Sequence, residues 1–75
     1  MDQMEQLKQI VAENLGCDAA SLTETTHLAD DLNADSLDMV ELSMAVEEAF
    51  GISFTDEQLA TVRTLGDMKV LLENA

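Results

Sequence analysis

The feature that most constrains the fold is a run of apolar residues at helical spacing that continues to Phe50 and stops at Gly51. Asp35, a preferred N-cap residue, precedes this run, and Gly is the usual residue just past a helix C-terminus. The pattern predicts a helix from about Ser36 to Phe50. Ser36 then lies in the first turn, with its side-chain oxygen exposed.

On a helical wheel of about 100° per residue, this helix has apolar residues on two opposite sides. One side is a normal core stripe, formed by Met39, Leu42, Val46, Ala49 and Phe50. The other consists of Leu37, Val40 and Met44, bordered by Glu41, Glu47 and Glu48. So small a domain should not cover both sides of one helix, so we expect the second stripe to be partly exposed and to serve as a docking surface. The alternative is that Val40 and Met44 line the edge of the core beside the first or last helix.

Apolar spacing and helix-start signals predict three further helices. The first spans about residues 3–15. Capping boxes that begin at Thr55 and Thr64 predict a short third helix and a final helix. Ile52 and Phe54 have no partner strand and should plug the bundle. The inner face of the final helix is predicted to consist of Leu65, Met68, Leu71 and Leu72.

The connection between residues 16 and 35 is long for a compact domain. We expect three apolar anchors to pin it to the core, namely Leu22, Leu28 and Leu32. A capping-box pattern over Ser21–Glu24 predicts a short helical turn within it. The predicted fold is all-α, a single domain over residues 1–75 built as a small four-helix bundle with a long first loop and a short third helix.

The net charge is −13, from sixteen acidic residues and only three Lys or Arg. Lys8 and Arg63 enclose an interval that has no basic residue and holds most of the carboxylates. Such a surface repels nucleic acid and anionic membranes and attracts proteins that carry basic patches. A solvated acidic face that only confers solubility is the alternative, but it does not explain why basic residues are absent from the middle.

Nothing in the sequence indicates export or membrane insertion. No apolar run approaches the roughly 20 residues of a membrane span, and the N-terminus lacks the basic and apolar regions of a signal peptide. A cytoplasmic monomer is expected. Cys17 is alone, so no intrachain disulfide is possible, and we interpret it as an inert small residue. His27 is interpreted as a polar loop residue.

Three roles can be weighed for Ser36. A nucleophile needs a base within reach and donors for an oxyanion, yet Asp31, Asp35 and Asp38 are carboxylates and only His27 could act as a neutral base. Catalysis is therefore not expected. The second role is that of an ordinary helix-start serine. The third is an acceptor hydroxyl modified by another enzyme, since free N–H groups and the helix dipole favour a phosphate ester at a helix N-terminus.

Asp35-Ser36-Leu37-Asp38, preceded by Leu32-Asn33-Ala34 and followed by Val40-Glu41-Leu42, resembles the prosthetic-group attachment motif of acyl carrier proteins. The resemblance extends over nearly the whole chain, from the amphipathic first segment to the closing helix. Asn33 departs from the family's usual Gly, but Asn also tolerates a left-handed backbone, so the turn should survive. Ile52-Ser53-Phe54-Thr55 replaces the Ile-Pro of many members at the start of the third helix.

The resemblance implies that a holo-acyl-carrier-protein synthase transfers 4′-phosphopantetheine from coenzyme A to Ser36. The arm thiol would then hold growing acyl chains and present them to fatty-acid synthesis enzymes, and the carrier itself would catalyse nothing and need no metal. The apolar centre of docking would be Leu37, Val40 and Met44. Basic patches of the partners would meet Asp35, Asp38, Glu41, Glu47 and Glu48. Polyketide carriers share much of this motif, although it favours fatty-acid synthesis over amino-acid carriers.

Two alternative functions, each from a different class of protein, can be tested against the sequence. Asp31-x-Asn33-x-Asp35 copies the opening of an EF-hand calcium loop, but the sixth position, which needs Gly, is Ser36, and the twelfth, which needs Glu, is Leu42. A dedicated calcium site is not expected, and weak divalent binding to the clustered carboxylates stays open. The second rival is an acidic adaptor that docks through the apolar stripe without modification of Ser36.

Overall fold

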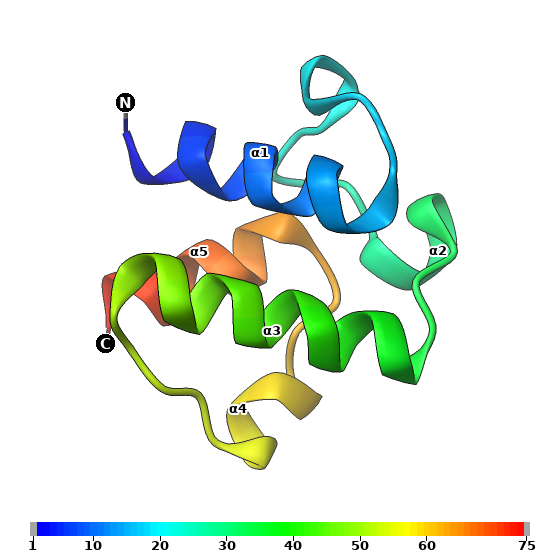
Figure 1. Ribbon diagram of the computed structural model, residues 1–75. Helices are drawn as coiled ribbons and strands as arrows, with labels where there is room; N and C mark the ends of the chain where they lie inside the picture. Colours follow the sequence, from blue (N-terminus) through cyan, green and yellow to red (C-terminus); the bar gives the residue numbers. More distant parts are fainter. Residues whose placement is uncertain (1, 75) are drawn as a thin grey trace.

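The computed structural model describes residues 2–74, and this part of the chain is helical (Figure 1). The elements in chain order are α1 Gln3–Leu15, the 3-10 helix η1 Ala19–Ser21, α2 Leu28–Leu32, α3 Ser36–Phe50, α4 Asp56–Ala60 and α5 Leu65–Glu73. Within residues 2–74 the only β-type pairing is one isolated antiparallel bridge between His27 and Thr64. The predicted all-α fold is confirmed, with α2 as a helix that the sequence did not indicate.

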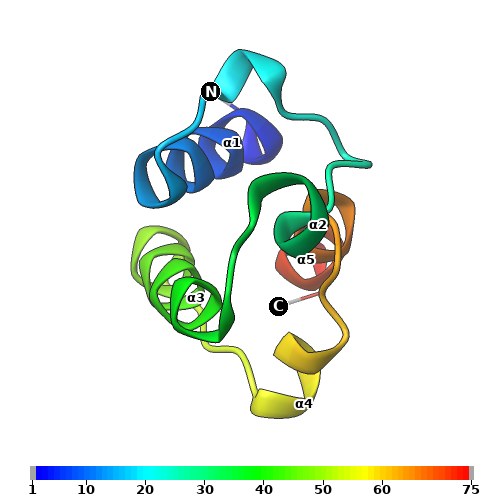
Figure 2. The ribbon, with the colours of Figure 1, turned by 90° about the vertical axis from the view of Figure 1, so that its right-hand side faces the viewer.

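The core lies between α1, α3 and α5, which Figure 2 shows around a common centre. Side chains with no exposed surface come from all three helices, namely Leu7, Val11, Leu42, Val46, Leu65 and Met68. Full burial of an aliphatic side chain of this size is worth roughly 1.5–3 kcal/mol. The inner side of α3 is therefore fixed to the bundle by the hydrophobic effect.

The predicted core stripe of α3 is correct except at one position. Leu42 and Val46 are buried, and Met39 and Phe50 are half-buried against the core, but Ala49 is exposed. On the helical wheel Ala49 lies at the edge of the stripe, on the side away from Phe50. Ile52 and Phe54 pack against the core from the segment after α3, as predicted. Of the final helix, Leu65, Met68 and Leu72 are buried and Leu71 is half-buried.

The long connection is pinned where its leucines predicted, but its helical turns lie elsewhere. Leu22 and Leu28 are buried and Leu32 is half-buried against the core. The turn predicted at Ser21–Glu24 is wrong, because η1 ends at Ser21 and is capped by Asp18, whose carboxylate accepts from the Ala20 N–H at 3.0 Å. The Ser21 hydroxyl is already used, since it donates to the Asp18 carbonyl at 2.7 Å.

Two distant segments, residues 24–28 and 63–66, pair side by side and together form a strap across the bundle. The N–H of Leu28 donates to the Arg63 carbonyl at 2.9 Å, and the N–H of Leu65 donates to the Thr26 carbonyl at 3.1 Å. The N–H of Gly66 donates to the Glu24 carbonyl at 2.9 Å. A Cβ on Gly66 would lie 3.0 Å from that same oxygen, so the close approach favours a glycine at this position.

An ion pair holds the strap to α5. Lys69 Nζ lies 3.0 Å from Glu24 Oε1 and 3.8 Å from Glu73 Oε1. The hydrogen bond with Glu24 raises the pKa of the Lys69 ammonium above its usual value. Both partners are partly exposed, so the pair orients the side chains more than it stabilises the fold.

Both predicted capping boxes near the C-terminus are confirmed. Thr55 and Gln58 cap α4 reciprocally, and Thr64 and Asp67 do the same for α5. Asp67 Oδ2 accepts from the N–H of Arg63 at 2.9 Å and from the N–H of Thr64 at 3.1 Å. These two backbone bonds lower the pKa of the Asp67 carboxyl, because they favour its charged form.

None of the helices within residues 2–74 combines the length and apolar character that crossing a bilayer requires.

Candidate functional site

Ser36 is the first residue of α3, and its neighbours form the helix cap. The N–H of Asp38 donates to Asp35 Oδ1 at 2.9 Å, and the N–H of Asp35 donates back to Asp38 Oδ2 at 3.2 Å. Because Asp35 and Asp38 cap the helix reciprocally, the side chain of Ser36 is not needed for capping. Ser36 is exposed. The sequence predicted the exposed hydroxyl and the N-cap, and it missed that Asp38 completes the box.

The turn before α3 is built on Asn33. Its backbone is left-handed, with φ 58° and ψ 32°, and its N–H donates to the Leu28 carbonyl, which ends α2. The next residue, Ala34, is buried and also donates its N–H to Leu28, at 3.1 Å. Asn33 therefore preserves the turn in place of Gly, as expected, and Ala34 anchors the chain just ahead of Ser36.

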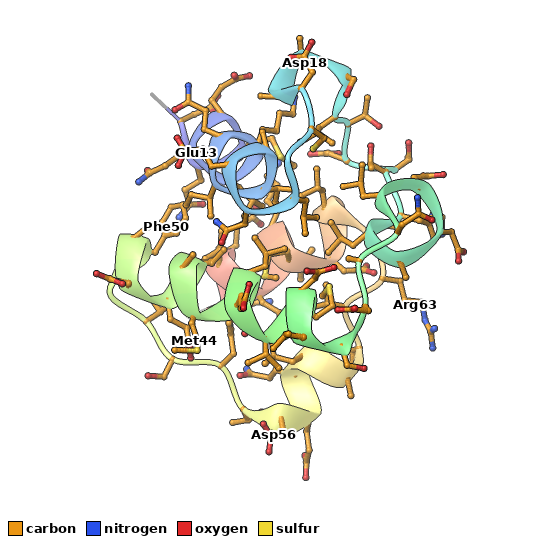
Figure 3. All side chains as sticks on the ribbon, turned by 45° about the vertical axis from the view of Figure 1, so that its right-hand side comes forward. Glu13, Asp18, Met44, Phe50, Asp56 and Arg63 are labelled. Atoms are coloured by element: carbon orange, nitrogen blue, oxygen red, sulfur yellow. The ribbon has the colours of Figure 1, made fainter. Side chains whose placement is uncertain are left out.

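The second apolar stripe of α3 faces solvent. Leu37 is 65% exposed, Val40 51% and Met44 61%. Figure 3 shows Met44 on the side of α3 away from α1, whereas Phe50 lies on the α1 side. The alternative in which Val40 and Met44 line the core edge is therefore wrong. Exposed apolar side chains that share one helix face are typical of a surface that contacts another protein.

The carboxylates expected around this stripe are not equivalent. Asp35, Glu41 and Glu48 are exposed, and Asp38 is half-buried in the cap. Glu47 is half-buried because its Oε2 accepts from the N–H of Phe54 at 2.7 Å. This bond ties the C-terminal turn of α3 to the segment that plugs the core. No sequence pattern signals it, since it joins a helix residue to a backbone amide seven positions later.

His27 lies at the start of α2 rather than beside Ser36. Its N–H donates to Asp31 Oδ2 at 2.8 Å, and its Nδ1 is 3.9 Å from the same oxygen. Asp31, the first carboxylate of the calcium-like pattern, therefore bonds the backbone of the residue that precedes α2, while Asp35 caps α3. Among residues 2–74, no group of three or more His, Cys, Asp or Glu side chains is arranged to hold a metal ion.

The fold and the sequence both match known proteins. A family described as "Phosphopantetheine attachment site" matches residues 5–71. A candidate acyl carrier protein from Mycobacterium tuberculosis has a similar structure, with a TM-score of 0.87 and 26% identity over 95% of this chain and 96% of that one. The acyl carrier protein of Enterococcus faecalis has a TM-score of 0.79 and 26% identity over 96% of this chain and 92% of that one.

These matches place the chain in a class of proteins, the small helical domains to which phosphopantetheine is attached. The chain therefore belongs to the phosphopantetheine-attachment family, and within that family it is an acyl carrier protein. The chemistry of α3 fits the prosthetic group, because an exposed hydroxyl stands at a helix N-terminus where N–H groups favour a phosphate ester.

Proposed function

We propose that Ser36 carries the 4′-phosphopantetheine arm and that this carrier serves fatty-acid synthesis in the cytoplasm without catalysing a reaction itself. When bound, the arm supplies a thiol that holds acyl groups as thioesters. The observation that carries the proposal is the exposed Ser36 hydroxyl, which the capping box of Asp35 and Asp38 leaves free.

The first turn of α3 supplies the electrostatics of attachment. The first N–H groups of a helix have no intrahelical acceptor, and the Asp35 carboxylate takes only that of Asp38. The N–H groups of Ser36 and Leu37 are therefore available to a phosphodiester on Ser36, with the positive end of the helix dipole behind them. The same turn holds the attachment point rigidly, because buried Ala34 precedes it and half-buried Met39 follows it.

Partners would dock on the outer side of α3. Its exposed carboxylates suit basic patches on a holo-acyl-carrier-protein synthase and on fatty-acid synthesis enzymes, and they would accelerate encounter. Leu37, Val40 and Met44 would supply the apolar contact that sets the lifetime of each complex. The carrier thus tethers its cargo and raises the effective concentration of that cargo at each partner.

The test is modification by a holo-acyl-carrier-protein synthase in the presence of coenzyme A, read by intact mass. The parent should gain the mass of one phosphopantetheine, and Ser36→Ala should gain none. Ser53→Ala is the matched control, because Ser53 is also an exposed serine but lies outside the helix start. Modification of the Ser36→Ala variant would show that the arm is attached elsewhere.

A further inference from the structure

Glu47 fixes the segment that follows α3 through both its backbone and its side chain. Its backbone carbonyl accepts from the N–H of Gly51 and, at 3.1 Å, from the N–H of Ile52. Its side-chain Oε2 accepts from the N–H of Phe54 at 2.7 Å. Ile52 and Phe54 are half-buried against the core. The bond from the carboxylate therefore holds Phe54 and the chain around it to the C-terminal end of α3.

The same segment leads directly into α4. Phe54 precedes Thr55, the N-cap of α4, whose hydroxyl accepts from the N–H of Gln58 at 3.0 Å. In Figure 1 the segment leaves the end of α3 and turns back beneath that helix to reach α4. α4 has five residues and none of them is fully buried, so its position depends on the segments that flank it. A change at Phe54 therefore reaches α4.

Glu47 also lies on the face of α3 that carries the exposed apolar stripe. It is three residues beyond Met44, which itself follows Val40 by four, so the three side chains share one side of the helix. A partner that docks on this stripe, as proposed above, therefore meets Glu47 as well.

The second oxygen of this carboxylate is free for such a contact. Within residues 2–74, Glu47 forms no salt bridge, and its carboxylate makes a single hydrogen bond, the one to Phe54. Every buried side-chain oxygen or nitrogen in this part of the chain has a hydrogen-bond partner, so Oε1, which has none, is open to solvent. A cation of a partner protein can therefore reach Oε1.

We propose that Glu47 distinguishes partners that present arginine to this face from partners that present lysine. The distinction rests on the proposed docking of partners on the outer side of α3. An arginine guanidinium binds both oxygens of a carboxylate through parallel N–H bonds, so it takes Oε2 from the N–H of Phe54. A lysine ammonium binds Oε1 as a point charge and leaves the bond to Phe54 in place. An arginine-bearing partner thus releases Phe54 and α4 from α3, whereas a lysine-bearing partner docks on an unchanged surface.

The experiment compares two amphipathic helical peptides of the same sequence, in which every basic residue is arginine in one and lysine in the other. Each is added to saturation to the full chain without a prosthetic group, and amide hydrogen exchange is followed by NMR. Shifts of the Val40 and Met44 amides show that a peptide docks on the stripe.

The two peptides should differ in their effect on the Phe54 amide. The arginine peptide should lower its protection from exchange at least about tenfold and shift the amides of α4, because the hydrogen bond to a charged acceptor is lost. The lysine peptide should lower that protection less than about twofold. The Ile52 N–H is the internal control, since it bonds to the backbone carbonyl of Glu47 and should keep its protection with either peptide.

Substitutions assign the difference to the carboxylate of Glu47. Glu47→Gln should abolish it, because a neutral amide offers a guanidinium one acceptor oxygen instead of two. Glu48→Gln, which removes the same charge from the neighbouring exposed position, should leave the difference unchanged. Equal protection of Phe54 in the two complexes of the parent, or a difference that survives Glu47→Gln, would overturn the proposal.

The same titration separates this proposal from the proposed function. If neither peptide shifts the Val40 and Met44 amides, docking on the outer side of α3 fails, and the distinction between arginine and lysine fails with it. If both peptides shift those amides and leave Phe54 equally protected, only the distinction fails. The attachment at Ser36 is tested independently by mass, because the titrated chain carries no arm.

Discussion

The inner and outer sides of α3 carry similar apolar residues in opposite environments. Leu42 and Val46 on the inner side have no exposed surface, whereas Val40 and Met44 on the outer side are more than half exposed. Burial of the inner residues stabilises the fold, whereas the exposed outer residues are available to contact another molecule. The type of an apolar residue in α3 therefore does not show whether it contributes to stability or to binding. Its position on the helical wheel determines which of the two it does.

The largest effect expected from this comparison is on the free energy of unfolding. Leu42→Ala should lower it by about 2–5 kcal/mol, because a fully buried leucine leaves a cavity when truncated. Met44→Ala, two residues further along the same helix, should change it by less than about 0.5 kcal/mol. Urea unfolding measures both. The outer variant should instead speed dissociation from a partner enzyme, and equal losses of stability in the two variants would contradict the comparison.

A similar contrast separates carboxylates bonded to the backbone from those left free. Asp67→Asn should lower the free energy of unfolding by about 1 kcal/mol at pH 7, because Asp67 caps α5 through two backbone N–H groups. The folded state lowers the pKa of this carboxyl, so the charged form contributes stability above the unfolded pKa of about 4.

That contribution disappears as pH falls through the lower, folded pKa. Thermal melts from pH 7 down to pH 3 should therefore show the parent and Asp67→Asn differing most at pH 5–7 and converging at the acid end. Asp56→Asn, at an exposed position in the first turn of α4, is the control. A difference that stays constant down to pH 3 would rule out this carboxylate as its origin.

The smallest effects should distinguish two glutamates on α3 that the sequence places in one group. Glu41→Gln should leave stability unchanged, slow association with a basic partner and flatten its salt dependence, because Glu41 is exposed. Glu47→Gln should also cost about 0.5 kcal/mol, because a neutral amide accepts the Phe54 N–H less strongly. Stopped-flow association and urea unfolding of both variants decide the point, and identical behaviour would mean that the bond to Phe54 has no effect.

The parts of the fold that the sequence predicted are those decided within a few residues. Asp35 and Gly51 delimit α3, and Gly51 is left-handed with φ 67° as expected at a helix end. Thr55 and Thr64 start their helices in the same local way. The exposure of Ser36 could be predicted in the same way, because it follows from the position of Ser36 in the first turn of α3.

The parts that escaped prediction depend on residues far apart in the chain. The N–H of Leu28 donates to the carbonyl of Arg63 across the strap. This pairing helps to hold α2, because its five residues are too few to form a stable helix alone. The bond between Glu47 and Phe54 also requires the folded chain. No periodicity or capping pattern contains this information.

The strap also has a consequence for the order in which the chain acquires its structure. Its two segments come from opposite halves of the sequence, so their pairing must overcome the entropy of closing a long loop. Contacts within α1 and α3 are local and form faster. We therefore expect the strap to close late in folding, after α1 and α3 have formed, so that the pairing of residues 24–28 with residues 63–66 is among the last contacts of the chain to be completed.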